Sequence, residues 1–319
     1  MKAVSIKEPG GPEVLEWIEA DDPRPAAGEV VVDVAASALN RADVMQRLGL
    51  YPLAPGTSPY PGLEASGRIS AVGEGVTGWQ VGDEVCALLT GGGYAQKVAV
   101  PAGQLLPVPE GIGLVEAAGL PEAVATVWSN IVMTAGLKSG ETLLVHGGAG
   151  GVGTAAIQIA KALGARVVTT VGGPEKVARA RELGADVAVD HRTEDFAESG
   201  PYDVILDVVG GDYLERNVRS LAADGRLLVI GLQNGLEGNL NLAELVFKRA
   251  SVHGTTLRTR SKEQKAAIIA DVRKHVWPMI ENGAVRLLID RTVPMAEAAE
   301  AHRLMETGGH LGKILLVNS

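Results

Sequence analysis

The sequence has only one cysteine, Cys86, among its 319 residues. A single thiol cannot form an intrachain disulfide, and it is typical of a reducing compartment. No signal-like apolar segment opens the chain, and no run of about 18 apolar residues is present. We therefore expect a cytoplasmic protein that has no membrane partner.

Aromatic residues and positive charge are also scarce. Aromatic side chains make up 3% of the chain and hydrophobic residues 46%, so Ala, Val, Leu and Ile must build the core. The 29 basic and 38 acidic residues give a net charge of −9, and the basic residues form no run. An acidic chain without a basic run is poorly suited to bind the phosphate backbone of a nucleic acid, so we expect no nucleic-acid partner.

Glycine, in contrast, is abundant, with 41 residues, and it is concentrated after one apolar strand. The strand Leu143–Val145 leads into His-Gly-Gly-Ala-Gly-Gly-Val-Gly, and a helix is predicted over Thr154–Leu163. A strand, a glycine turn and a helix bring backbone N–H groups to a pyrophosphate. A tight turn without a ligand is the alternative. A P-loop is disfavoured because no Gly-Lys-Ser/Thr follows.

The sequence after this turn alternates apolar strands with helical segments, for example Pro174–Leu183 and Gly211–Ala222. Strands that alternate with helices predict a parallel sheet covered on both faces, which is the doubly wound α/β fold. The predicted strands are Arg166–Val171, Val187–Asp190, Asp203–Val209, Arg226–Gly231 and Ser251–Thr255.

The first 120 residues have a different pattern, in which alternating strands are separated by turns rich in glycine and proline. This pattern predicts a β-rich, partly barrel-like domain. The C-terminal residues predict helices over Lys262–Asn282 and Met295–Thr307 and strands over Leu287–Val293 and Lys313–Val317. This tail either extends the nucleotide domain or returns to the first one. The predicted strands of the first domain are Glu29–Ala35, Ala65–Val72 and Tyr94–Val100.

The end of the second predicted strand indicates which dinucleotide binds. An NAD site places an acidic residue there to bind the ribose 2′-OH, but this strand ends at Gly172 and Gly173. Lys176 follows, and His191 and Arg192 end the next strand. A site that lacks an acid and has nearby cations favours the 2′-phosphate of NADPH over NADH.

Five motifs occur in a fixed order along the chain. They are Asn40-Arg-Ala-Asp43, Gly62-Leu-Glu-Ala-Ser-Gly67, Pro121-Glu-Ala123, Gly150-Gly-Val-Gly-Thr-Ala-Ala-Ile-Gln158 and Leu311-Gly-Lys-Ile314. With these motifs the chain resembles the medium-chain dehydrogenases/reductases, and more narrowly the zinc-independent NADPH:quinone oxidoreductases of the zeta-crystallin type. Residues 40–43, 247–249 and 257–260 are most similar to the tumour-suppressor-inducible quinone oxidoreductase.

The resemblance implies a GroES-like catalytic domain (1–121), a Rossmann NADPH-binding domain (122–262) and a C-terminal return to the catalytic domain (263–319). It also implies a homodimer or homotetramer. Lys313 either contacts a cofactor phosphate or only caps the last strand. With the residues named above, the predicted NADPH-binding set is Thr126, Ala149, Gly150, Gly151, Val152, Gly172, Lys176, His191, Gly231, Leu257 and Lys313.

The chain departs from the zinc alcohol dehydrogenases at the positions of their catalytic metal ligands. Where those enzymes carry Cys, His and Cys, this chain has Asn40, Leu63 and Glu122. Tetrahedral zinc takes Cys, His or carboxylate ligands, and only Glu122 qualifies. We therefore expect no metal.

Without a Lewis acid, the enzyme should favour acceptors that delocalise charge themselves, such as quinones. Asn40 is the candidate donor to a quinone oxygen. Asp43 is expected to fix Arg41 or a neighbouring N–H, or only to cap a helix. Tyr51 is expected to stack on the acceptor or to donate a proton, or only to pack in a turn.

Two other functions stay open at this stage. An NADPH-dependent enoyl-thioester, alkenal or enone reductase would share the fold, the cofactor and the lack of zinc. A non-catalytic NADPH-binding structural or RNA-binding protein is the third interpretation, and the acidic charge argues against RNA.

Overall fold

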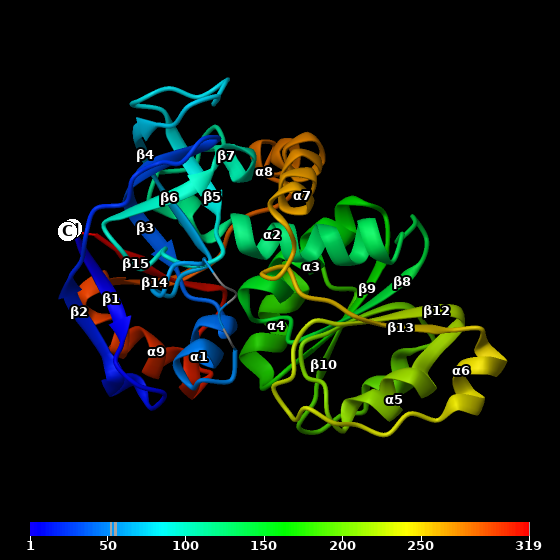
Figure 1. Ribbon diagram of the computed structural model, residues 1–319. Helices are drawn as coiled ribbons and strands as arrows, with labels where there is room; N and C mark the ends of the chain where they lie inside the picture. Colours follow the sequence, from blue (N-terminus) through cyan, green and yellow to red (C-terminus); the bar gives the residue numbers. More distant parts are fainter. Residues whose placement is uncertain (52, 54–55, 319) are drawn as a thin grey trace. The chain divides into compact units, whose positions relative to one another are not determined.

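The computed structural model describes residues 1–51, 53 and 56–318, and the chain forms two compact units (Figure 1). The second unit comprises Thr126–Thr256 and Asn282–Arg286. The predicted boundaries at 121/122 and 262/263 therefore differ from the observed ones by a few residues. The first unit comprises Met1–Ala125, Leu257–Glu281 and Leu287–Ser319.

The first unit is built on a seven-stranded sheet in which β14, β15, β3, β4, β5 and β7 follow one another and β6 pairs with β3. A separate ribbon joins β1 to β2. The strands are β1 (Lys2–Ile6), β2 (Leu15–Glu19), β3 (Glu29–Ala38), β4 (Glu64–Val72), β5 (Glu84–Leu88), β6 (Lys97–Pro101), β7 (Leu105–Pro107), β14 (Ile289–Pro294) and β15 (Lys313–Val317).

The C-terminal strand β15 pairs antiparallel with β3, so that Leu315 lies opposite Ala38. The end of the chain thus joins the sheet that its beginning forms. Short helical segments cover this sheet: η1 (Pro12–Val14), α1 (Arg41–Arg47), η2 (Ala102–Gln104), η3 (Glu116–Gly119), α7 (Lys262–His275), α8 (Trp277–Glu281), η6 (Met295–Glu297) and α9 (Ala298–Thr307).

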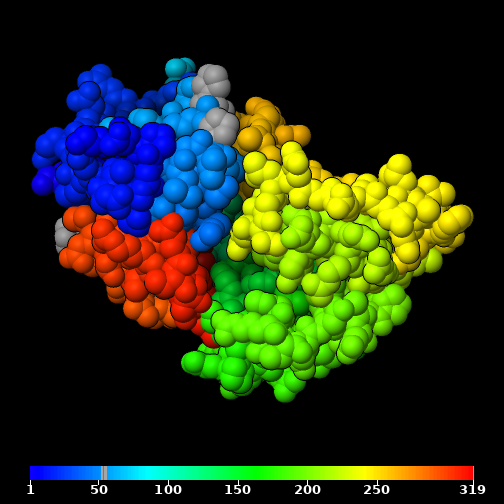
Figure 2. Space-filling view, turned by 90° about the horizontal axis from the view of Figure 1, so that it is seen from below, coloured from blue at the N-terminus to red at the C-terminus, as the bar shows by residue number. Residues whose placement is uncertain are grey.

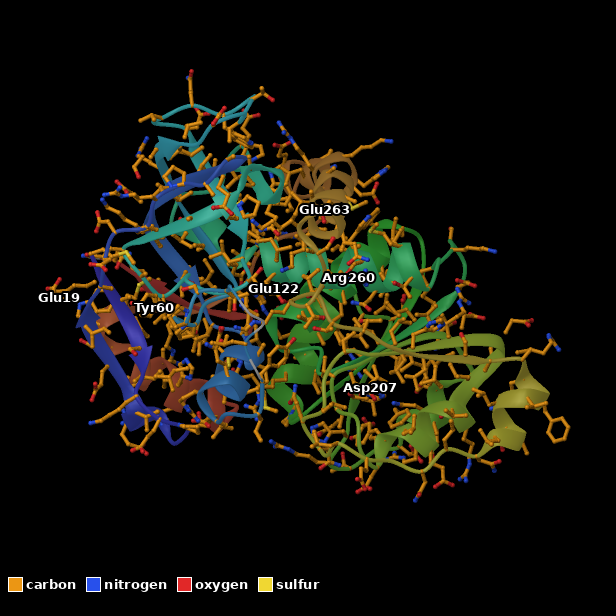
Figure 3. All side chains as sticks on the ribbon, in the orientation of Figure 1. Glu19, Tyr60, Glu122, Asp207, Arg260 and Glu263 are labelled. Carbon is orange, nitrogen blue, oxygen red and sulfur yellow. The ribbon has the colours of Figure 1, made fainter. Side chains whose placement is uncertain are left out.

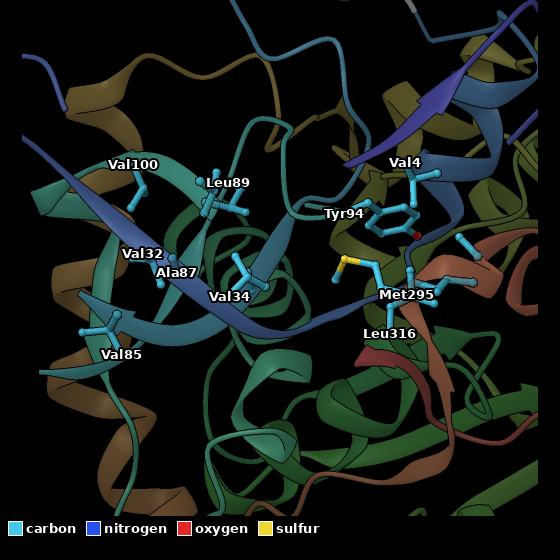
Figure 4. Packing of buried hydrophobic residues seen from close by; sticks show 14 of the residues in the cluster. Val4, Val32, Val34, Val85, Ala87, Leu89, Tyr94, Val100, Met295 and Leu316 are labelled. Atoms are coloured by element: carbon cyan, nitrogen blue, oxygen red, sulfur yellow. The ribbon is translucent and has the colours of Figure 1, made fainter. Parts of the chain in front are cut away.

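Small and branched side chains fill the core of this unit (Figure 4). Val32, Val34 and Ala87 from the sheet are buried, and Tyr94 brings one of the few aromatic rings into this core. Leu316 of β15 belongs to the same cluster, so burial of apolar surface holds the C-terminal strand in place.

The second unit is a parallel six-stranded sheet with the strand order β10-β9-β8-β11-β12-β13. Helix α3 packs on β8 and β9, α4 on β9 and β10, and α5 and α6 on β12. The elements are η4 (Trp128–Thr134), β8 (Thr142–His146), α3 (Gly151–Ala162), β9 (Arg166–Val171), α4 (Pro174–Glu182), β10 (Val187–Asp190), η5 (Phe196–Ser199), β11 (Tyr202–Asp207), α5 (Tyr213–Ser220), β12 (Leu221–Val229), α6 (Leu242–Lys248) and β13 (Ser251–Gly254).

The order of the strands reverses at β8, because β9 lies on one side of it and β11 on the other. Ligands of doubly wound sheets bind outside the carboxyl ends of the strands at such a switch point. The predicted α/β class, with a doubly wound sheet and a β-rich second part, is confirmed. The remaining helix, α2 (Pro121–Val127), contains the boundary between the two units.

The predicted elements differ from the observed ones mainly at their ends. The helix predicted over Lys262–Asn282 is divided into α7 and α8 next to Pro278, which has no N–H to donate. Strand β12 begins at Leu221 rather than Arg226 and passes through Asp224, whose φ is 61°. No helix among the described residues has both the length and the apolar character to cross a bilayer.

Candidate active site

The glycine turn of the second unit is too tight for side chains at two positions. A methyl group on Gly148 would lie 2.1 Å from Thr169 Oγ1, and one on Gly153 would lie 2.2 Å from the carbonyl oxygen of Gly147. Helix α3 starts after Gly150, which has no side chain to cap the first N–H groups. These groups and the helix dipole remain available to an anion.

The imidazole of His191 and the guanidinium of Arg192 lie together at the end of β9. A methyl group on Gly172 would lie 3.1 Å from His191 Nε2 and 3.2 Å from Arg192 Nε. Asp190 accepts hydrogen bonds from the backbone N–H groups of Gly173 and Arg192, which ties the two loops together. Lys176 is partly exposed in the first turn of α4.

The carboxyl ends of β11 and β12 also approach each other closely. A methyl group on Gly231 would lie 2.6 Å from the carbonyl oxygen of Val208, so no side chain fits there. The buried Asp207 (Figure 3) accepts hydrogen bonds from the N–H groups of Val209 and Gly210, and it thereby fixes the loop after β11. Thr126, in α2, is partly exposed.

A buried ion pair joins β4 to β15 in the first unit. Lys313 Nζ lies 2.5 Å from Glu64 Oε1, and the side chains are 3% and 0% exposed. The ammonium also donates to Asn40 Oδ1 (2.8 Å) and to the carbonyl oxygen of Leu39 (3.0 Å). All three of its hydrogens have protein acceptors, so the predicted contact of Lys313 with a cofactor phosphate does not fit this structure.

Asn40 is held by the same ion pair. Its Nδ2 donates to Glu64 Oε1 (2.9 Å) and to the carbonyl oxygen of Ala38 (3.2 Å), and its Oδ1 accepts from Lys313. Both amide hydrogens are engaged. The predicted hydrogen bond from Asn40 to a quinone oxygen therefore does not fit, and the geometry makes Asn40 a positioning residue.

Asp43 is fully buried at the start of α1. Its carboxylate accepts hydrogen bonds from the N–H of Asn40 (2.9 Å), the N–H of Gly62 (3.1 Å) and the hydroxyl of Tyr94 (3.1 Å). Burial raises the pKa of Asp43 to about 6, although these hydrogen bonds oppose the shift. Asp43 thus holds neighbouring backbone N–H groups, and its bond to the N–H of Asn40 is part of a capping box at the start of α1. Its hydrogen bonds within the described residues do not include Arg41.

Glu122, at the start of α2 (Figure 3), lies close to this network. Its backbone N–H donates to Glu64 Oε2 (2.9 Å). Burial, and secondly the charge of Glu64, raise the pKa of the Glu122 carboxyl to about 8. A carboxylic acid that stays protonated at neutral pH is able to donate a proton.

Tyr51 lies beside a buried arginine. The guanidinium of Arg258 is 5.0 Å from the centre of the Tyr51 ring. Leu257, which precedes this arginine, is 8% exposed.

The predicted site residues thus fall into two groups. Asn40, Asp43 and Lys313 share one hydrogen-bonded network, and Tyr51 and Leu257 also belong to the first unit. The others lie in the second unit. Thr126 belongs to α2 and Lys176 to α4, and the rest lie at or just after the carboxyl ends of the strands: Ala149, Gly150, Gly151, Val152, Gly172, His191 and Gly231.

Sequence reasoning missed three residues that the structure places in these sites, Glu64, Arg258 and Lys265. Glu64 and Arg258 lie inside the motifs Gly62–Gly67 and Leu257–Arg260, which could have drawn attention to them. Lys265 gives no such signal, because a lysine in the first turn of a helix normally faces solvent.

The positions that hold zinc in the alcohol dehydrogenases do not fit a metal in this chain. Leu63 has no donor atom and is 1% exposed, and the Asn40 amide is fully hydrogen-bonded. The structure shows no cluster of three or more His, Cys, Asp or Glu residues suited to a metal ion, within residues 1–51, 53 and 56–318. The nearby cation is instead the ammonium of Lys313.

Two family models match the chain. Residues 26–110 match the alcohol dehydrogenase GroES-like domain, and residues 183–316 match the zinc-binding dehydrogenase family. The quinone oxidoreductase of Rattus norvegicus is 30% identical over 99% of this chain and 98% of its own length.

Larger proteins also contain a similar segment. A mycocerosic acid synthase-like polyketide synthase of Mycobacterium tuberculosis is 33% identical over 98% of this chain. The chain spans only 15% of the length of that relative.

Solved structures share the whole fold. A quinone oxidoreductase of Escherichia coli complexed with NADPH is 30% identical, with a TM-score of 0.88 over 99% of this chain and 100% of that one. The CurK enoyl reductase is also 30% identical, with a TM-score of 0.87 over 100% of this chain and 99% of that one.

We expect Lys313→Met to destabilise the protein by about 3–5 kcal/mol, because Glu64 would remain as an unpaired buried charge. Urea unfolding would measure this loss. The double variant Glu64→Gln/Lys313→Met should recover much of it, and the exposed Lys274→Met is the control. A loss below about 1 kcal/mol for Lys313→Met would contradict the importance of the pair.

Glu122→Gln should become increasingly stabilising as the pH rises. The folded protein keeps a proton on Glu122 up to about pH 8, whereas the unfolded chain releases it near pH 4.5. Glu122 therefore costs stability as the pH rises through this interval, and a neutral glutamine avoids the cost. We expect a relative gain on the order of 2 kcal/mol between pH 5 and pH 8. A pH-independent difference, or the same trend for the exposed Glu110→Gln, would refute this explanation.

Proposed function

The chain belongs to the medium-chain dehydrogenase/reductase superfamily, and on this premise we propose that it reduces quinones with NADPH and without zinc. One observation carries the proposal. The cation beside Glu64, close to the family's metal position, is the ammonium of Lys313, and Glu64 is already neutralised by it. An enzyme arranged in this way suits acceptors that need no Lewis acid, because a quinone takes charge into its own ring.

The second unit would hold the cofactor, which supplies hydride from its nicotinamide when bound. The N–H groups at the start of α3 would bind the pyrophosphate, and Gly148 and Gly153 allow the required close turn. His191 and Arg192 would bind the 2′-phosphate above Gly172, with Lys176 nearby in sequence. Gly231 would leave room for the other half of the dinucleotide.

The first unit would hold the acceptor and supply a proton. Reduction of a quinone to a hydroquinone consumes one hydride and one proton. We assign the proton to the Glu122 carboxyl, because its raised pKa keeps it protonated at neutral pH. Tyr51 would then pack against the acceptor, and the Glu64–Lys313 pair would fix Asn40 and the start of α2.

The second candidate is an NADPH-dependent enoyl-thioester reductase. It is favoured by the polyketide synthase relative and by the similarity to the CurK enoyl reductase. This reaction also adds a hydride and a proton, and it needs no metal. The two candidates differ in the acceptor alone.

We also propose that the protein is a homodimer. Large apolar side chains between residues 232 and 247 are exposed, with Leu236 at 74% and Phe247 at 82%. The segment that contains α6, yellow in Figure 2, projects from the surface of the second unit. Apolar patches of this kind are typical of protein interfaces.

NADPH should bind about tenfold to a hundredfold more tightly than NADH, because charge-assisted hydrogen bonds to the 2′-phosphate contribute roughly 1.5–3 kcal/mol. Titration by tryptophan fluorescence measures both affinities. Arg192→Ala should remove most of the difference, and Arg181→Ala, an exposed arginine of α4, should not. Equal affinities of the wild type for both cofactors would refute the assignment of the 2′-phosphate site.

Oxidation of NADPH should be faster with 9,10-phenanthrenequinone and 1,4-benzoquinone than with crotonyl thioester or a simple ketone. Chelators should leave the rate unchanged, and metal analysis should find no stoichiometric zinc. Glu122→Gln should lower the rate by on the order of 10²-fold or more, as is typical of general acid catalysis, and Tyr51→Phe by much less.

Three results would contradict this assignment in different ways. Crotonyl thioester turned over a hundred times faster than any quinone would favour the enoyl reductase. One zinc per chain, lost together with the activity, would overturn zinc independence. A larger loss for Tyr51→Phe than for Glu122→Gln would make Tyr51 the proton donor.

The dimer should dissociate when its apolar surface becomes charged. We expect Phe247→Asp to sediment as a monomer in analytical ultracentrifugation, while the exposed Val81→Asp in the first unit sediments like the wild type. A wild-type protein that is monomeric at micromolar concentration would refute the proposal.

A further inference from the structure

Two buried cations of the first unit, Arg258 and Lys265, lie side by side, and no carboxylate among the described residues is bonded to either. Arg258 is 6% exposed and Lys265 is 2% exposed. Lys265 Nζ donates to the carbonyl oxygen of Arg258 (2.8 Å) and to Thr90 Oγ1 (2.6 Å). Arg258 Nε donates to the carbonyl oxygen of the same threonine (3.0 Å).

The hydrogen-bond acceptors of these cations among the described residues are all neutral. Arg258 Nη2 donates to Gln46 Oε1 (2.6 Å), and Gln46 is held in turn by the carbonyl oxygen of Pro59. Arg258 Nη1 is buried and has no acceptor among the described residues. A buried charge is costly unless it is paired, and an orphaned donor adds to the cost.

Two carboxyl groups, those of Asp43 and Glu122, interact electrostatically with these cations but do not compensate both charges. Burial raises the pKa of Asp43 and the charge of Arg258 opposes this rise, but the carboxylate oxygens of Asp43 already accept hydrogen bonds from Asn40, Gly62 and Tyr94. Glu122 interacts electrostatically with Lys265, but its pKa of about 8 keeps it largely protonated at pH 7. Burial lowers the pKa of Lys265. The charge of Glu122 opposes this shift, and the charge of Arg258 adds to it.

We propose that Arg258 and Lys265 form a binding site for an anionic group of the acceptor, such as a carboxylate or sulfonate. Arg258 Nη1 is the donor that such a group would use. The ring of Tyr51 lies against the same guanidinium and offers an apolar face to the body of the ligand. Arg260 (Figure 3) has a buried Nε that also lacks an acceptor among the described residues, and it lies two residues further along the chain.

The inference rests on the proposed function only in assigning the anion to the acceptor. Anion binding can be measured with compounds that cannot be reduced. A failure of the anion-site proposal is therefore distinct from a failure of proposed quinone reduction. Naphthalene-1-sulfonate and its neutral analogue naphthalene-1-sulfonamide form a matched pair. Calorimetric titration of the full chain, saturated with NADP⁺, gives both affinities.

The sulfonate should bind at least tenfold more tightly than the sulfonamide. Arg258→Gln and Lys265→Met should each lower sulfonate affinity about tenfold or more and change sulfonamide affinity less than threefold. The exposed Arg273→Gln and Lys274→Met, both in α7, are the matched controls. If Arg258→Gln fails to fold, Arg258→Lys keeps the charge and should retain a preference for the sulfonate.

Two outcomes would overturn the proposal. Equal affinities of the wild type for the two compounds would show that the cations bind no anion. Displacement of the sulfonate by NADP⁺, in a titration that starts from cofactor-free protein, would assign the site to a cofactor phosphate instead of the acceptor.

A catalytic assay would connect the site to turnover. The wild type should have a lower KM for 1,2-naphthoquinone-4-sulfonate than for 1,2-naphthoquinone, and Lys265→Met should remove this preference through KM. A preference that is unchanged in Lys265→Met and Arg258→Gln would refute the proposed role of both residues.

Discussion

The buried ion pair between Glu64 and Lys313 is the interaction on which the first unit depends. It joins β4 to the last strand, and the same two side chains fix Asn40 and the backbone at Glu122. A buried pair of this kind is weak evidence for stability, because desolvation offsets the attraction. Its effect is specificity. Every alternative placement of β15 would leave a charge buried without its partner.

The surroundings of the ion pair also bear on the pKa of Glu122. Burial is the main cause that raises this pKa, the charge of Glu64 adds to the shift, and the charge of Lys313 opposes it. The ammonium of Lys313 therefore does not compensate a second carboxylate beside Glu64. The positive charge of this arrangement comes from Lys313, which the C-terminal strand β15 brings beside Glu64.

The α/β class and the glycine turn could be predicted from the sequence because they depend on local patterns. Apolar strands alternate with helices, and Gly148 and Gly153 tolerate a turn that excludes any Cβ. The partners of long polar side chains could not be predicted in this way. Lys313 is 249 residues from Glu64 and Arg258 is 212 residues from Gln46. Pairing over such separations is decided by strand order, as in the contact of β15 with β3.

The same reason explains the errors at individual residues. Asn40 was expected to face an acceptor, because its position follows an active-site strand, but its amide hydrogens are engaged by Glu64 and Ala38. For Lys313 the sequence left two roles open, a contact with a cofactor phosphate or a cap on the last strand, and neither includes its buried partner Glu64. A buried donor must find an acceptor within the fold, and a local sequence pattern does not identify that acceptor.

The first unit buries the pair Glu64 and Lys313 and the pair Arg258 and Lys265. The two pairs differ in their hydrogen-bond acceptors, and this difference indicates their roles. Lys313 meets a carboxylate and two neutral oxygens, so its site is complete within the protein. Within the described part of the chain, Arg258 and Lys265 donate only to neutral oxygens, and Arg258 Nη1 has no acceptor. Conformational specificity accounts for the first arrangement, since removing either partner exposes the other to an apolar surrounding. The second has no such internal compensation, and its cost is relieved only when an anion from outside the chain completes it.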